Sequence, residues 1–180
     1  MKTSEAKELF RQMTENFFAK HNVVWANQSR IQKPKQPLIT LTPGNVRRHN
    51  FAQEEIDDEG YIAGLYESHL SMTIDLYTHG TPILGDNDEI LAYEDTAMDE
   101  LLAFEDYMNS PMCTNWCYVN NISILISEPV QTLTGVINDT NYEYRARQVF
   151  DLTFTQTTED TIGKDYLGAM TDVDIESRWN

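Results

Sequence analysis

The stretch "LYESHLSMTIDLYTHG", residues 65–80, alternates apolar and polar side chains along most of its length. Successive side chains of a β-strand point to opposite faces of a sheet, so this pattern predicts a long strand. We expect its apolar set to face a core: Tyr66, Leu70, Met72, Ile74 and Leu76. Its polar set should face solvent or a neighbouring subunit: Glu67, His69, Ser71, Thr73, Asp75 and Tyr77.

Four further stretches have the β-branched and aromatic composition of strands. They are residues 23–28, 38–42, 118–127 and 143–157. We expect the second to stop at Pro43–Gly44, with residues 45–51 extending it beyond a bend. Residues 29–37, 52–60, 80–88 and 131–143 are rich in turn-forming or charged residues and are predicted to be loops.

Two stretches show helical spacing of apolar residues. The first begins at Ser4, a plausible N-cap, and should end near His21. The second is "YEDTAMDELLAFEDYM", residues 93–108, to whose apolar stripe Ile90 and Leu91 also fit. We expect Asp86 or Asp88 to cap this helix and Pro111 to end it.

This order of elements predicts an α+β fold with a mixed or antiparallel sheet of about four to five strands and helices packed on one face. Residues 1–158 should form a single domain. Residues 159–180 have weak periodicity and many acids, so we expect an extended C-terminal tail that becomes ordered through partner contacts.

The charge of the chain is strongly segregated. The net charge is −16, yet residues 1–48 hold nine Lys/Arg and three acids. Residues 49–144 hold 19 acids and no Lys or Arg. This separation can serve solubility, or it can let the positive end of one copy meet the negative flank of another.

The sequence offers little support for catalysis or for a bound cofactor. It contains no G-x-S-x-G elbow, P-loop or G-x-G-x-x-G motif. Residues 86–89 resemble only part of a calcium loop, and the four histidines lack a recognised metal-binding spacing. Cys113 and Cys117 form a lone C-x3-C, which favours two reduced, partly buried thiols over a disulfide or a metal role. We therefore predict no catalytic, metal-binding or cofactor-binding residues, with a metal-dependent hydrolase built on clustered carboxylates as a third alternative.

Interfaces with other proteins are the more plausible sites. The basic segment offers Arg30, Lys33, Lys35, Arg47 and Arg48, and the acidic helix offers Asp95, Asp99 and Glu100. Arg145 and Arg147 lie on the polar face of the last strand. Trp179, near the end of a polar tail, could insert into a partner, because Trp is enriched at interface hot spots.

Several motifs in a fixed order resemble the neck-terminator or tail-completion proteins of tailed bacteriophages. They are "VVWANQS", "PLITLT", "YESHLSMTIDLYTHG", the acidic helix and "YEYRARQVFDLTFTQTTED" followed by Ile162–Gly163. The resemblance covers roughly residues 1–163. It implies a tail-terminator-like α+β subunit without catalytic residues or cofactors, assembling into a ring.

The resemblance further implies a structural virion protein, built in the bacterial host cytoplasm and located in the tail or neck. Such a ring, of six copies in related terminators, ends the tail tube at its head-proximal end and joins it to the neck. The expected partners are other copies, the tail tube protein, and a neck, connector or head-completion protein, with a sheath as a further candidate. DNA would pass through the lumen without specific binding, and no membrane is involved.

A second function fits the composition as well. An acidic chain can mimic DNA and bind a host nucleic-acid-binding protein. The basic N-terminal segment and the amphipathic strands argue against it, because a mimic needs neither.

Overall fold

The computed structural model describes residues 1–26, 35–49, 53–56, 62–138 and 141–159. Its elements follow in the order α1 (Thr3–Phe17), β1 (Asn22–Trp25), β2 (Leu38–Arg48), β3 (Gln53–Ile56), β4 (Ile62–Thr78), β5 (Thr81–Leu84), β6 (Ile90–Glu94), α2 (Ala97–Met108), α3 (Pro111–Val119), β7 (Ile122–Thr132), β8 (Gly135–Asn138) and β9 (Asn141–Glu159). Residues 160–180 of the predicted tail, including Trp179, lie outside the described residues, as do Arg30 and Lys33, whereas Glu159 is the last residue of β9.

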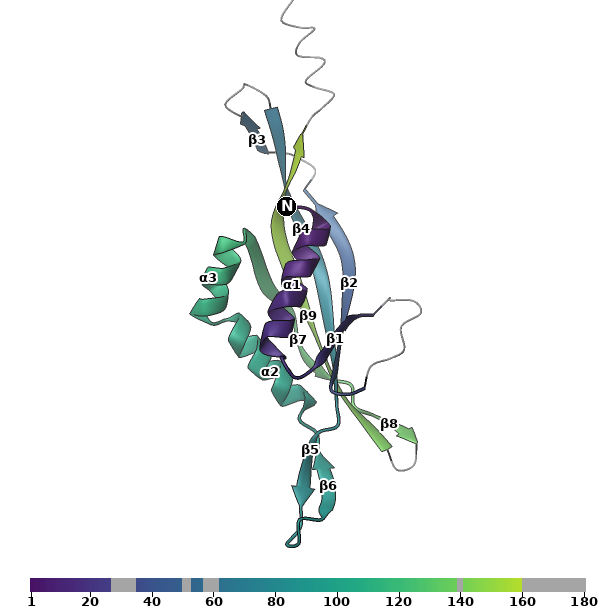
Figure 1. Ribbon diagram of the computed structural model, residues 1–180. Helices are drawn as coiled ribbons and strands as arrows, with labels where there is room; N and C mark the ends of the chain where they lie inside the picture. The colour runs from purple at the N-terminus through teal and green to yellow at the C-terminus, as the bar shows by residue number, and fades with distance from the viewer. Residues whose placement is uncertain (27–34, 50–52, 57–61, 139–140, 160–180) are drawn as a thin grey trace, which may run out of the picture.

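A mixed sheet forms the centre of the molecule, with its main strands in the order β1-β2-β4-β9-β7. β1 runs parallel to β2, and the other pairs of this order are antiparallel. β3 extends the sheet beside β4, and β8 does so beside β9 (Figure 1). The α+β class, the mixed sheet and its five main strands are as predicted.

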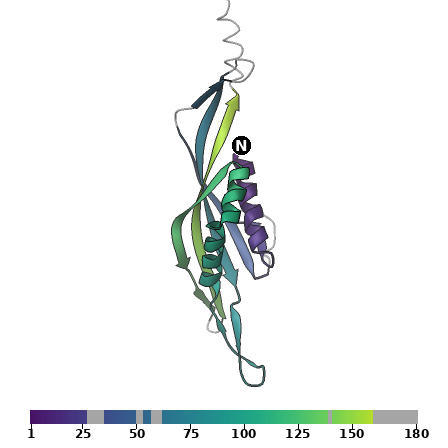
Figure 2. The same cartoon turned by 90° about the vertical axis from the view of Figure 1, so that its left-hand side faces the viewer.

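All three helices lie on one face of this sheet (Figures 1 and 2). Leu70, Met72, Ile74 and Leu76 of β4 point to that face and are fully buried, as the alternation predicts. Phe150 of β9 contacts the rings of Phe10 from α1 and Phe104 from α2, at centroid distances of 5.5 and 5.7 Å. Burying each large apolar side chain stabilises the fold by about 1.5–3 kcal/mol, so this contact fixes both helices on the sheet.

The opposite face is covered by none of the described elements (Figure 2). It carries the polar set of β4 together with the outward residues of β9, because paired residues of antiparallel strands share a face. We call this surface the open face.

The start of the second helix was predicted wrongly. Residues 90–94 are not helical but form β6, which pairs with β5 in a separate two-stranded sheet. The N–H of Gly85 donates to the carbonyl of Glu89 at 2.8 Å, and Asp88 adopts a positive φ of 60°, so the chain turns here. Neither Asp86 nor Asp88 caps α2, whose N-cap is Thr96. We call residues 81–94 the arm.

Pro111 does not end the helical region. It occupies the first turn of α3, where its missing N–H costs nothing, and Ser110 caps this helix by accepting from the N–H of Cys113. A proline three residues beyond a helix end is therefore a start signal here as much as a stop signal.

Smaller corrections concern strand and helix ends. β2 continues through Pro43–Gly44 to Arg48, with a register shift between Pro43 and Val46, because the bulge accommodates the proline. Two of the predicted loops contain the short strands β3 and β8, which pair with the ends of β4 and β9. α1 has Lys2 rather than Ser4 as its N-cap and ends at Phe17.

Candidate subunit interface

The open face carries an ion-pair cluster across its two longest strands. Arg145 Nη2 and Arg147 Nε of β9 donate to Oδ1 of Asp75 on β4, at 2.9 and 2.8 Å. Asp75 is 4% exposed, whereas both arginines are partly exposed. The hydrogen bond to Asp75 raises the pKa of Arg147 above its ordinary value. Arg145 and Arg147, which the sequence suggested as interface residues, are therefore paired with Asp75 of their own chain.

The two arginines at the end of β2 point to different faces. Arg48 lies over the ring of Tyr66 at 4.4 Å and donates to Gln156 on β9, so it belongs to the helix-covered side. Arg47 pairs with His69 in the register and is exposed on the open face. It lines a hollow of about 1000 Å³ together with Gly44, Asn45, Ser71 and Asp151. Lys35 is also exposed.

Two of the predicted interface acids, Asp95 just before α2 and Glu100 within it, already have hydrogen-bond partners in their own chain. Asp95 accepts from the N–H of Ala97 and from the hydroxyl of Thr134. Glu100 contacts His21 Nε2 at 3.0 Å and accepts from the Thr96 hydroxyl, and the His21 hydrogen bond lowers the pKa of Glu100. Of the three acids predicted as interface candidates, Asp99 alone is exposed.

The arm carries more exposed large apolar side chains than any other part of the described structure, and sequence reasoning missed it. All of its strand residues are exposed, including large apolar side chains: Ile83, Leu84, Ile90, Leu91 and Tyr93. Figure 1 shows it projecting from the end of the sheet. Two apolar runs separated by a short segment with Gly85 are a hairpin signal, which the helical spacing of Ile90 and Leu91 obscured.

The base of the arm is firmly joined to the main sheet. The hydroxyl of Tyr144 on β9 donates to the carbonyl of Tyr93 at 3.0 Å. Gly80, with a positive φ of 75°, makes the sharp turn between β4 and β5. A two-stranded hairpin is marginal by itself in water, so an arm with exposed apolar residues is typical of a partner-binding element.

The two thiols lie on α3 and are not poised for nucleophilic chemistry. Cys113 is buried, with its Sγ 3.4 Å from Sδ of Met13. Burial raises the pKa of Cys113 and raises that of Cys117 to about 12. A reactive cysteine needs the opposite shift, because the thiolate is the nucleophile.

An exposed apolar arm, an uncovered polar sheet face and a segregated charge define a protein that acts through contacts with other proteins. The chain belongs to the family of phage neck terminator proteins, whose family model matches residues 5–177. No curated protein matches the chain. The described helices all fall short of the length and apolar character needed to cross a bilayer.

Family membership confirms the resemblance seen in the sequence. It identifies the chain as a structural protein of the phage neck, located in the tail of the virion. The family is a structural and non-enzymatic one whose members interact with other tail and head proteins. It lends no support to the alternative of a DNA mimic.

Proposed function

We propose that this chain assembles into a homohexameric ring at the head-proximal end of the tail, where the ring ends the tail tube and joins it to the neck or connector. The arm is the observation that carries this proposal. Its apolar side chains are exposed on a firmly anchored hairpin, and we assign them to the interface with the adjacent copy.

The distribution of charge favours a second copy of this chain as the partner that the arm contacts. The tip of the arm carries Asp86, Asp88 and Glu89, all exposed. The exposed bases Lys20, Lys35 and Arg47 lie in the N-terminal part of the chain. A closed ring uses a head-to-tail contact between two different patches, and an acidic arm meeting a basic patch of the next copy satisfies that requirement.

The same arrangement suits passage of DNA. The acidic middle of the chain repels phosphate groups, so a wall built from it lets DNA pass without specific binding. The tail tube protein, the neck or connector protein and a sheath would contact the flat sides of the ring. We assign the segment after residue 158 to such partner contacts, and residues 1–158 to one domain.

Assembly can be tested by sedimentation velocity and negative-stain microscopy of the purified chain, alone and with tail tubes. The double variant Ile83→Ser/Leu91→Ser should keep its thermal stability and lose the ring. Met112→Ser removes an equally exposed apolar side chain from α3 and should leave the ring intact. A wild-type chain that stays monomeric even on tail tubes would contradict the proposal.

A further inference from the structure

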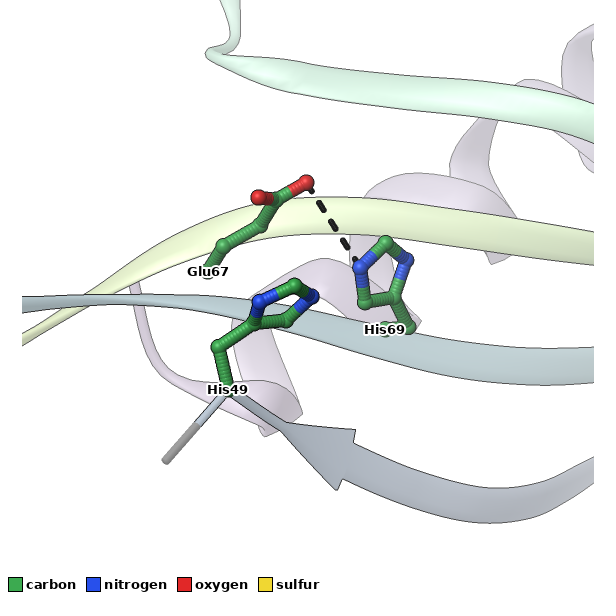
Figure 3. A group of neighbouring side chains, drawn as sticks. All are labelled: His49, Glu67 and His69. Carbon is green, nitrogen blue, oxygen red and sulfur yellow. Dashed lines mark ion pairs between the residues drawn. The ribbon is translucent and has the colours of Figure 1, made fainter. Parts of the chain in front are cut away.

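Three side chains with metal-ligating atoms meet at one end of the open face (Figure 3). Glu67 and His69 are two residues apart on β4, so they point to the same side. His49 directly follows β2, and its backbone N–H donates to the carbonyl of Glu67 at 3.0 Å. Sequence spacing hides this group, because His49 joins it only through strand pairing.

The distances are close to those of a zinc site. The potential ligand atoms of His49, Glu67 and His69 all lie within 4.8 Å of one another. Glu67 Oε1 and His69 Nε2 are 3.5 Å apart. Ligand atoms about 2.1 Å from a tetrahedral zinc ion are about 3.4 Å from each other. The Glu67–His69 pair already has this spacing. Rotation about the side-chain torsions of the exposed His49 can bring its ring nitrogen to a similar distance from the other two ligand atoms.

A neighbouring hydroxyl fixes the orientation of His69. Thr153 Oγ1 on β9 lies 3.0 Å from His69 Nδ1, which leaves Nε2 facing Glu67. Histidines that bind metals commonly hydrogen-bond through their other ring nitrogen in this way. The site is also accessible, because both histidines line the hollow of the open face.

We propose that His49, Glu67 and His69 bind one zinc ion per chain, with water in the fourth position. Imidazole nitrogens favour zinc over calcium or magnesium, and a carboxylate supplies negative charge. Arg47 lies opposite His69 in the register, and its positive charge weakens the binding. This site is independent of the proposed ring, since all three ligands belong to one chain.

Equilibrium dialysis against Zn²⁺, followed by elemental analysis, tests the proposal. The wild-type chain should bind one ion, and His49→Ala and His69→Ala should each weaken binding by at least about tenfold. His79→Ala removes an exposed histidine outside the group and should bind as the wild type does. Co²⁺ in place of zinc should give the visible absorption of a four-coordinate site.

Two further variants guard against misfolding as an explanation. Thr153→Val should weaken zinc binding without removing a ligand, and Arg47→Gln should tighten it, which no folding defect can do. Absence of zinc binding in the wild type would overturn the proposal. Binding that survives in both His49→Ala and His69→Ala would overturn it too, because the ion would then lie elsewhere.

Discussion

At the scale of single residues, Asp75 is the most consequential polar group of the open face. It is almost fully buried and accepts hydrogen bonds from two arginines of the adjacent strand. A buried carboxylate is tolerated only when it is paired in this way. Asp75 therefore ties β4 to β9 at the end of the sheet from which the arm projects.

Replacing this carboxylate should be costly. Asp75→Asn removes the carboxylate that Arg145 and Arg147 share, and we expect a loss of about 2 kcal/mol in the free energy of unfolding. Asp151→Asn makes the same change on the same face and should cost less than about 0.5 kcal/mol. Urea denaturation of both variants measures the difference. Equal losses would show that the ion-pair cluster is not what stabilises this end.

Cys117 gives a prediction for pH dependence. Its pKa of about 12 lies above the ordinary thiol value, so very little thiolate exists at pH 8. Alkylation of the folded chain by iodoacetamide should then be roughly a thousandfold slower than for an unperturbed thiol, and its rate should keep rising with pH well beyond 9. Fragment-resolved mass spectrometry of the wild-type chain measures the rate at Cys117, with the urea-unfolded chain as control; Cys113 must stay in place, because it contributes to the raised pKa of Cys117. A rate that levels off near pH 9 would contradict the prediction.

At the scale of elements, the arm owes its direction to one glycine. A Cβ on Gly80 would lie 2.1 Å from the Glu94 carbonyl oxygen and 2.9 Å from the ring of Tyr144. The positive φ of Gly80 disfavours any other residue as well. The hinge of the arm is therefore rigid, which keeps the apolar hairpin at a fixed angle to the sheet.

Gly80→Ala should displace the arm and destabilise its base by about 2 kcal/mol. Ring formation should be lost while the main sheet remains folded. Gly85→Ala, at the tip, would meet only the flexible side chain of Glu89 and should be nearly neutral. Sedimentation velocity together with near-ultraviolet circular dichroism separates the two effects. An intact ring in Gly80→Ala would show that the direction of the arm is unimportant.

At the scale of the whole molecule, the segregated charge should govern assembly. Residues 1–48 are basic overall and residues 49–144 carry only acids among their Asp, Glu, Lys and Arg residues. Attraction between such regions of adjacent copies is screened by salt, since the Debye length falls from about 10 Å at 0.1 M to about 3 Å at 1 M. The ring should therefore weaken as salt is raised, unless apolar contacts dominate it.

A charge reversal on the exposed side of α2 tests this expectation. Asp99→Lys should weaken the ring at low salt, and Asp99→Asn should do so by less. Asp95 and Glu100 are unsuitable for this test, because their hydrogen bonds within the chain confound assembly with stability. Light scattering across a salt series measures the effect. Equal assembly of all three proteins at low salt would remove Asp99 from the interface.

The sequence predicts most of the main sheet because its strongest signals are local. Alternation in residues 65–80 and 143–157 identifies the two longest strands and the side chains that they bury. The arm was misread because Ile90 and Leu91 fit helical spacing, while turn formation at Gly85–Asp88 and pairing with β5 decided otherwise. Interface residues were the least predictable, because a charge pattern does not reveal which charges pair within the chain.

By itself the sequence determined the α+β class, the buried face of the sheet and the separation of charge, since each follows from side chains close together along the chain. Only the tertiary structure decided that Asp75 meets two arginines, that residues 81–94 project as an arm, and that His49 joins Glu67 and His69. The physical reason is strand register. Pairing brings together residues far apart along the chain, such as Asp75 and Arg147 at a separation of 72 positions, and no local periodicity encodes which of them meet.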